Sequence, residues 1–247
     1  MTTRPRIYLL DVEGTVAPIS LVTEQLFPYA RIHVHDFVLR NLRDDPAVRA
    51  DLVLLWEENQ AETDPTSPRL SGVDSPELDH PQFTVAAMMY FNWLMDRDRK
   101  STALKSLQGK IWKSGFESGA LKGILFADVL PALERWSSHA QVAIYSSGSV
   151  GAQRLLFRYS SFGDLSGLIA AHFDTRTGAK WDRLSYAAIA AAMQVAPGEV
   201  RFYSDVVREL DAAREAGCET RLVVREGNAP VEDAHEHPVI DSFAQEL

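Results

Sequence analysis

Two carboxylates separated by a single residue are the first feature of this sequence that could do chemistry. Asp11 directly follows a short apolar run, Ile7–Leu10. Glu13 comes two residues later, and Gly14 behind it permits a turn tight enough to bring both carboxylates into one space. The first could bind Mg²⁺ with one oxygen and attack phosphorus with the other, and the second could transfer a proton. The alternative is a turn that closes a strand, with both carboxylates merely solvated.

Two serines form a second candidate group. Ser146 and Ser147 follow the apolar run Gln141–Tyr145 and precede a segment with helical spacing, Val150–Arg158. Their hydroxyl groups and the amides at the start of the helix could bind a phosphate group. Serines at this place can equally be ordinary helix caps, and the two interpretations stay open.

A lysine and a further carboxylate complete the candidate set. Lys180 comes after the short run 169–173, where its charge could offset that of a phosphate group and of the nucleophile. A lone lysine is also commonly a solvated surface residue. Asp205 comes at the end of the predicted strand 200–203 and could complete a Mg²⁺ site with Asp11, because Mg²⁺ prefers few carboxylates together with water and phosphate oxygens.

The segments that carry these residues indicate a parallel sheet. Strand-like and helix-like patterns alternate from 142 to 224, which is typical of a doubly wound α/β fold. The run Ile7–Leu10 is apolar throughout, as expected of a strand buried on both faces. Ligands of such sheets bind outside the carboxyl ends of the strands, where every candidate residue stands.

The chain between the first strand and the rest carries helical patterns. They cover 21–42 with an interruption at Pro28, then Pro46–Ala61, 83–98 and 102–118, and a polar loop is expected over 62–77. We therefore predict an α/β fold with a Rossmann-like parallel sheet core and an inserted all-helical cap. The predicted core domain comprises 1–19 and 126–247, and the predicted cap comprises 20–125.

Composition and charge restrict the class of partner. The chain has 247 residues and a net charge of −9, which argues against broad binding to nucleic acid or to an anionic membrane surface. No apolar stretch approaches the ~20 residues needed to span a bilayer, and the start of the sequence lacks a signal-peptide pattern. The single cysteine, Cys218, fits a reducing compartment. We expect a cytoplasmic protein that acts on a small molecule.

The order of the candidate residues resembles a known series of motifs. A carboxylate pair, a serine, a lysine and a carboxylate, each near the end of a predicted strand, resemble the haloacid dehalogenase-like hydrolases. The sequence Asp-Val-Glu-Gly-Thr over 11–15 is similar to the enolase-phosphatases (acireductone synthases) of methionine salvage. Other stretches that resemble this family are spread along the chain, at 26–31, 107–109, 126–129, 145–150, 152–157, 172–175, 204–206 and 223–228.

The resemblance implies a reaction in two steps. The family enolises 2,3-diketo-5-methylthiopentyl 1-phosphate and then removes its phosphate to give the acireductone 1,2-dihydroxy-3-keto-5-methylthiopentene. It implies Mg²⁺ as cofactor and a monomer. Carried over by position, Asp11 is a metal ligand and the nucleophile, Glu13 is the second acidic residue of the metal site and takes part in catalysis, and Asp205 also holds Mg²⁺.

The same carry-over assigns the remaining roles. Ser146 and Ser147 would bind the phosphate group of the substrate, and Lys180 would bind phosphate or orient Asp11. Either Glu13 or Lys180 could remove the proton in the enolase step. Closure of the cap could exclude water from the reaction intermediates.

Several alternatives stay open at this point. On the cap, Gln108, Trp112 and Lys113 are candidates to contact the methylthio end of the substrate, although a helix core or surface would explain them equally. The chain could instead be a Mg²⁺-dependent phosphatase of another small phosphate ester. It could also be a phosphate-binding protein without catalytic activity, although every expected catalytic position holds a competent residue.

Overall fold

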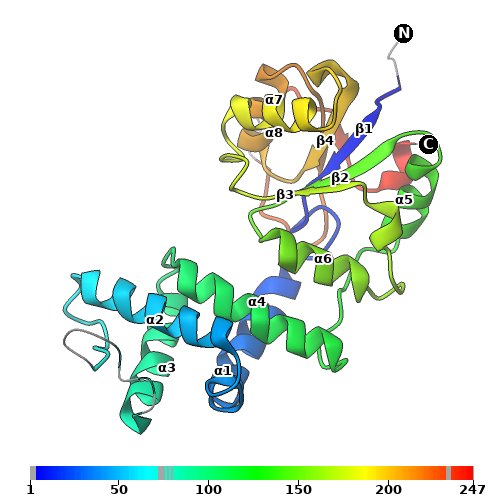
Figure 1. Ribbon diagram of the computed structural model, residues 1–247. Coiled ribbons are helices and arrows are strands. Elements are labelled where there is room, and N and C mark those ends of the chain that lie inside the picture. Colours follow the sequence, from blue (N-terminus) through cyan, green and yellow to red (C-terminus); the bar gives the residue numbers. More distant parts are fainter. Residues whose placement is uncertain (1–3, 72–75, 77, 79, 232–234, 247) are drawn as a thin grey trace. The chain divides into compact units, whose positions relative to one another are not determined.

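A computed structural model of the chain describes residues 4–71, 76, 78, 80–231 and 235–246. The chain folds into two compact units (Figure 1). Met1–Gln25 and Gly119–Leu247 form the first, called the core unit below, and Leu26–Ser118 form the second, called the helical unit. The sequence predicted domain borders at 19/20 and 125/126, and these borders remain a prediction.

A six-stranded parallel sheet forms the centre of the core unit. Its strand order is β3-β2-β1-β4-β5-β6. The bounds are β1 Ile7–Leu10, β2 Gln141–Tyr145, β3 Ala171–Phe173, β4 Val200–Ser204, β5 Glu219–Val223 and β6 Val239–Ile240. The predicted Rossmann-like α/β fold is confirmed. Leu10 lies level with Ile144 of β2 and Tyr203 of β4, so Asp11 leaves the sheet between its two central neighbours.

Helices cover both faces of this sheet, as Figure 1 shows for α5 on one side and α7 and α8 on the other. The helices of the core unit are α5 Val129–Ser137, α6 Val150–Arg158, α7 Arg183–Ala192 and α8 Val207–Glu215. Alternate residues of β1 point to opposite faces. Leu9 packs in one cluster with Tyr186 of α7 and Leu210 of α8, and Tyr8 stacks on Trp136 of α5 at 4.4 Å between ring centroids. Burial on two faces explains why β1 has no polar residue.

Two elements of the core unit were not predicted from the sequence. The strand β6 has only two residues, and Val239 is 54% exposed, so the segment is too short to show the apolar pattern of a strand. The helix α5 did have a signal, because Val129, Leu133 and Trp136 recur at helical spacing and are all buried.

The helical unit has its own apolar core, in which Val34, Leu52 and Phe91 are buried. Its helices are α1 Phe27–Asn41, α2 Pro46–Ala61, α3 Pro81–Asp96 and α4 Thr102–Glu117. The interruption predicted at Pro28 occurs where a π-helical segment, Leu21–Leu26, gives way to α1, because a proline fits the first turn of a helix but not its interior. The predicted polar loop has no helix or strand over 62–71, and 72–75 and 77 lie outside the described residues.

The proposed cap contacts have structural partners within the helical unit. Gln108 is 5% exposed, and the indole N–H of Trp112 donates to the Leu26 carbonyl at 2.8 Å. Lys113 pairs with Glu117 at 3.8 Å. Burial of Gln108 and the contacts of Trp112 and Lys113 give each of the three residues a structural role within the helical unit. Among the described helices, none is long and apolar enough to cross a membrane.

The C-terminal segment is fixed to the sheet by a buried carboxylate. Glu246 accepts from Arg201 at 2.5 Å, from Arg221 at 2.6 Å and from the Tyr203 hydroxyl at 3.0 Å, and its side chain is 8% exposed. Burial by itself would raise the pKa of Glu246, but these cationic partners lower it below its ordinary value. The carboxylate therefore stays charged at neutral pH.

We expect Glu246→Gln to lower the free energy of unfolding by about 3 kcal/mol, because it removes the carboxylate partner of Arg221 and one of the two carboxylate partners of Arg201, the other being Glu219. Urea unfolding measures this change. The control is Glu199→Gln, whose partner Arg6 is 64% exposed and whose loss should cost less than about 1 kcal/mol. Equal losses in the two variants would contradict this account of the C-terminal segment.

Candidate active site

The centre of the candidate site is a lysine between two carboxylates. The Lys180 ammonium lies 2.6 Å from Asp11 Oδ1 and 2.6 Å from Glu209 Oε2. Asp11 is 4% exposed and Lys180 is 5% exposed, so the pair is shielded from water. The hydroxyl of Ser204, the last residue of β4, donates to Glu209 at 2.9 Å. A carboxylate oxygen can accept more than one partner, so Asp11 Oδ1 can take a further ligand beside Lys180.

The loop between β3 and α7 brings Lys180 to this place. The Tyr145 hydroxyl donates to the carbonyl of Gly178, and the Tyr186 hydroxyl donates to the carbonyl of Lys180, at 3.0 and 2.7 Å. A Cβ at Gly178 would stand 2.2 Å from Ser185 Oγ, so only glycine allows the loop to lie this close to α7. Lys180 is thus held by its backbone as well as by its charge.

The second predicted carboxylate contacts the first predicted serine. The Ser146 hydroxyl donates to Glu13 Oε2 at 3.0 Å and accepts from the amide of Gly148 at 3.0 Å. Ser146 would therefore have to exchange a partner in order to bind phosphate. Ser147 is exposed, and no hydrogen bond of its hydroxyl is found within the described part of the chain. Of the two serines, Ser147 has the hydroxyl that a phosphate group could meet directly.

Asp205 lies against the turn that follows β1. A Cβ at Gly14 would stand 2.3 Å from Asp205 Oδ2, and Gly14 has a φ of +72°, a backbone conformation that favours glycine. Gly14 therefore leaves the space that the Asp205 carboxylate occupies. The structure brings Asp11, Glu13 and Asp205 close enough to affect one another electrostatically.

The site holds more negative than positive charge. Burial first, and then the charge of Asp11, raise the pKa of Glu13, and the same two causes raise the pKa of Asp205 to about 6. Burial and Asp11 likewise raise the pKa of Glu209 to about 7. Burial would lower the pKa of Lys180, but Asp11 and Glu209 outweigh burial and raise it. One ammonium group faces four carboxylates, an excess of negative charge that suits a further cation.

This donor set fits Mg²⁺ better than a metal that needs a closed protein cage. Within the described residues, no group of three or more His, Cys, Asp or Glu side chains is arranged to hold a metal by itself. Mg²⁺ is commonly bound by one or two carboxylates, with water and substrate oxygens completing its shell. The available Oδ1 of Asp11 and the crowded carboxylates beside it are consistent with that mode.

Two features of the site go beyond the sequence-based expectations. Glu209, in the first turn of α8, was not predicted, although its position four residues after Asp205 places it one helical turn into the following helix. Trp181, directly after Lys180, is 55% exposed, and Arg208 lies over its ring at 5.0 Å, so the bulk of this side chain lies toward solvent.

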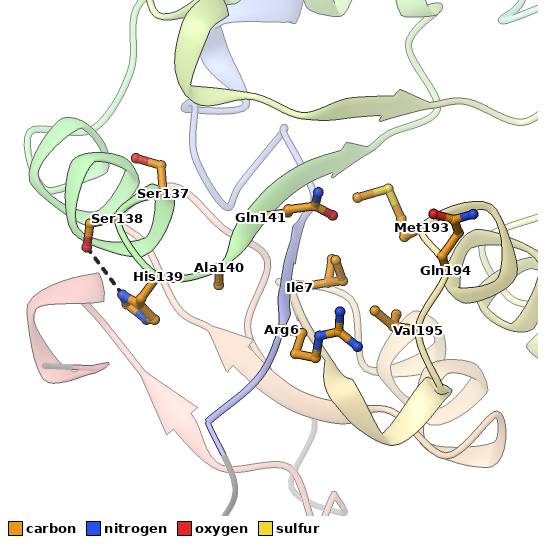
Figure 2. A pocket seen from close by; sticks show the side chains of 10 residues that line it. All are labelled: Arg6, Ile7, Ser137, Ser138, His139, Ala140, Gln141, Met193, Gln194 and Val195. Carbon is orange, nitrogen blue, oxygen red and sulfur yellow. Dashed lines mark hydrogen bonds between the residues drawn. The ribbon is translucent and has the colours of Figure 1, made fainter.

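A cavity of about 520 Å³ lies at the opposite edge of the sheet, at the start of β1 and β2 (Figure 2). Its lining includes Arg6, His139, Gln141 and Gln194, and none of its ten lining residues is an aspartate or a glutamate. The carboxylates Asp11, Glu13, Asp205 and Glu209 lie instead at the other edge, where β1 and β4 end.

Gln153 of α6 holds the loop that contains Ser146 and Ser147 by hydrogen bonds. Its amide group donates to the carbonyls of Gly148 and Phe173, both at 2.8 Å, and its oxygen lies 3.1 Å from His172 Nδ1, which must donate. Burial, with a smaller contribution from the Arg154 guanidinium, lowers the pKa of His172 to about 4. His172 therefore stays neutral in the folded protein at mildly acidic pH.

We expect this histidine to make stability depend on pH. Between about pH 6.5 and 4 only the unfolded chain takes up the proton. The free energy of unfolding therefore decreases as the pH is lowered, by about 1–2 kcal/mol from this group. Below about pH 4 both states are protonated, and His172 adds no further loss. His172→Asn keeps a donor for Gln153 and should remove this component, which urea unfolding at several pH values measures. Parallel pH profiles of the two proteins would contradict the assignment.

Relatives of the chain are found among curated sequences and among solved structures. No protein-family model matches the chain. It is 52% identical over 225 residues to enolase-phosphatase E1 of Synechococcus elongatus, covering 91% of this chain and 90% of the relative. The crystal structure of the UTR4 protein of Saccharomyces cerevisiae matches with a TM-score of 0.77 and 36% identity, over 97% of this chain and 99% of that chain. A 2-haloacid dehalogenase from Pseudomonas syringae shares the fold, with a TM-score of 0.57 and 16% identity over 98% of this chain and 96% of that chain.

Proposed function

The chain belongs to the enolase-phosphatase E1 family of haloacid dehalogenase-like hydrolases, and we propose that it catalyses both steps that the family name describes. The substrate is the small phosphate ester 2,3-diketo-5-methylthiopentyl 1-phosphate, and the products are acireductone and phosphate, in methionine salvage. The predictions of the family and of an enzyme with phosphatase and enolase activity are confirmed by this membership. A cytoplasmic, monomeric enzyme is part of the proposal.

One observation supports the catalytic assignment more than any other. Asp11 stands at the end of the central strand, 4% exposed, with one carboxylate oxygen 2.6 Å from Lys180. An aspartate held in this way has a fixed orientation, and its charge is partly offset by the ammonium group. Both properties suit a nucleophile that must approach a negatively charged phosphate group.

In the enolase step, we assign the base to Glu13. Lys180 lies between two carboxylates at 2.6 Å each, and an ammonium group in that position has no lone pair for a proton. Glu13 takes a proton from C1 of the substrate and returns it to the oxygen on C2. The Lys180 charge stabilises the negative charge that develops between these two transfers.

In the phosphatase step, an oxygen of Asp11 attacks phosphorus and the bond from phosphorus to the C1 oxygen breaks. The released oxygen takes a proton from solvent. Water then attacks the phosphorus atom, the bond to Asp11 breaks, and Glu13 receives the proton that the water loses. Ser147, Ser146 and Lys180 bind the phosphate oxygens, and Ser146 exchanges Glu13 for phosphate when it does so.

The carboxylates also define the cofactor of the proposal. Asp11 and Asp205, with Glu13 beside them, would hold Mg²⁺. The metal, when bound, neutralises charge on the phosphate group and on the nucleophile. Asp205, which follows β4, lies beside the Gly14 turn, and that turn directly follows Asp11 and Glu13.

We expect Asp11→Asn to lower phosphate release about 10⁴-fold, because the amide oxygen is a far weaker nucleophile. The measurement follows the diketone phosphate by ultraviolet absorbance while released phosphate is assayed, with and without Mg²⁺. A transient enol followed by phosphate supports the two-step assignment. The control is Asp44→Asn, which changes an exposed carboxylate of the helical unit.

Two outcomes would contradict the proposal in different ways. Release of phosphate from many esters, with no enol from the diketone, would indicate a general Mg²⁺-dependent phosphatase. No turnover of any phosphate ester by the wild-type protein would indicate a protein that binds phosphate without catalysis.

Gly14→Ala should weaken Mg²⁺ binding about 10-fold or more, because the added methyl group would displace the Asp205 carboxylate. Calorimetric titration with Mg²⁺ measures the affinity. Gly163→Ala is the matched control, since Gly163 also has a positive φ, +95°, but its Cβ would meet no atom within 4 Å. If both variants bind Mg²⁺ as the wild type does, Asp205 is not a ligand of the metal.

A further inference from the structure

The turn that carries the catalytic carboxylates is held partly by its own backbone. The carbonyl of Val12 accepts from the amides of Thr15, Val16 and Ala17, at 3.2, 2.9 and 2.9 Å. These bonds fold 12–17 into a compact loop at the end of β1. No amide of the loop donates to the carbonyls of Gly14 and Thr15, which accept from outside the loop.

Two side chains from the segment after β5 satisfy these outward carbonyls. The amide of Asn228 donates to the Gly14 carbonyl at 3.0 Å and to the carbonyl of Val223, the last residue of β5, at 3.3 Å. Arg225 Nε donates to the Thr15 carbonyl at 3.3 Å. Residues about 210 positions apart in the sequence thus fix adjacent peptide groups of the catalytic turn.

Arg225 is in turn fixed by contacts of Nη1 and of the plane of its guanidinium group. Its Nη1 donates to Asp128 Oδ2 at 2.9 Å and to the Asp241 carbonyl at 2.8 Å. Its guanidinium group lies between the rings of Phe126 and Phe243, 4.6 and 4.8 Å from their centroids, and its side chain is 7% exposed. A planar guanidinium group can make all of these contacts at once, whereas an ammonium group cannot.

The partner carboxylate responds to this arrangement. Burial by itself would raise the pKa of Asp128, but the hydrogen bonds from Arg225 and from the Phe243 amide lower it below its ordinary value. The Asp128–Arg225 pair is therefore charged at neutral pH. Replacing only one partner would leave the other charge buried and unpaired, which is costly.

We propose that Arg225, together with Asn228, is a positioning residue that holds the 12–17 turn so that Glu13 and Asp11 meet the substrate in a fixed geometry. The inference rests on the proposed roles of these two carboxylates. Displacement of a reacting group by about 1 Å can lower a rate about 100-fold, so a small shift of the turn would suffice.

The test compares two arginine variants of the full chain. Arg225→Lys removes the planar contact with the turn. Arg221→Lys is the matched control, because Arg221 also pairs with a buried carboxylate, Glu246 at 2.6 Å, and does not contact the turn. We expect Arg225→Lys to lower kcat about 30- to 100-fold with little change in KM, and Arg221→Lys to change kcat less than about 2-fold at a similar loss of thermal stability.

Hydrogen–deuterium exchange of the peptide that covers 12–17 gives a readout independent of activity. Exchange there should be faster in Arg225→Lys than in wild type and unchanged in Arg221→Lys. Asn228→Ala removes a contact with the turn without exposing a buried charge, so it tests the proposal even if Arg225→Lys does not fold. It should also accelerate exchange and lower kcat.

Specific outcomes would overturn the inference. One is wild-type exchange over 12–17 in both Arg225→Lys and Asn228→Ala. Another is a loss of kcat that follows thermal stability equally in the two arginine variants. Failure of the proposed function would appear as an inactive wild-type protein. Hydrogen–deuterium exchange would still show in that protein whether the 12–17 turn depends on Arg225 and Asn228.

Discussion

The ammonium group of Lys180 is the interaction on which the rest of the site depends. Buried carboxylates repel one another, and burying them without a cation would cost on the order of several kcal/mol each. Lys180 lies 2.6 Å from both Asp11 and Glu209, and so allows two carboxylates to stand in a shielded place. The remaining negative charge of Glu13 and Asp205 is what makes the site suited to a further cation. The same ammonium charge therefore stabilises the buried carboxylates and offsets the charge of Asp11, the proposed nucleophile.

The parallel sheet explains why residues so distant in the sequence gather there. All strands point in the same direction, so the segments that follow β1, β2 and β4 leave the sheet at one edge. β1 is central, and its exit is flanked on both sides by neighbouring strands. Each loop is then fixed by contacts of its own: Gly14 makes room for Asp205, and Ser146 holds Glu13. The cavity at the opposite edge has no such set of carboxylates.

Further stabilising contacts lie away from the candidate site. Tyr8, Trp136 and Tyr203 stack on one face of the sheet, and Glu246 ties the C-terminal turn to β4 and β5. The helical unit buries a separate cluster, so each unit has a core of its own. A rigid frame of this kind lets the core unit keep repelling carboxylates together, because the cost of the site is offset elsewhere.

The sequence by itself determined the local elements and the order of the motifs. Apolar runs and helical spacing depend only on near neighbours, so β1, β2, α2 and α6 could be located from their residues, and Asp11, Glu13, Lys180 and Asp205 could be assigned to strand ends. Only the tertiary structure decided which groups meet. Glu209 as the second partner of Lys180, Ser146 as the partner of Glu13, and the contact of Arg225 with Thr15 join residues from different loops. Such contacts leave no periodic pattern, because they depend on how the sheet places separate segments in space.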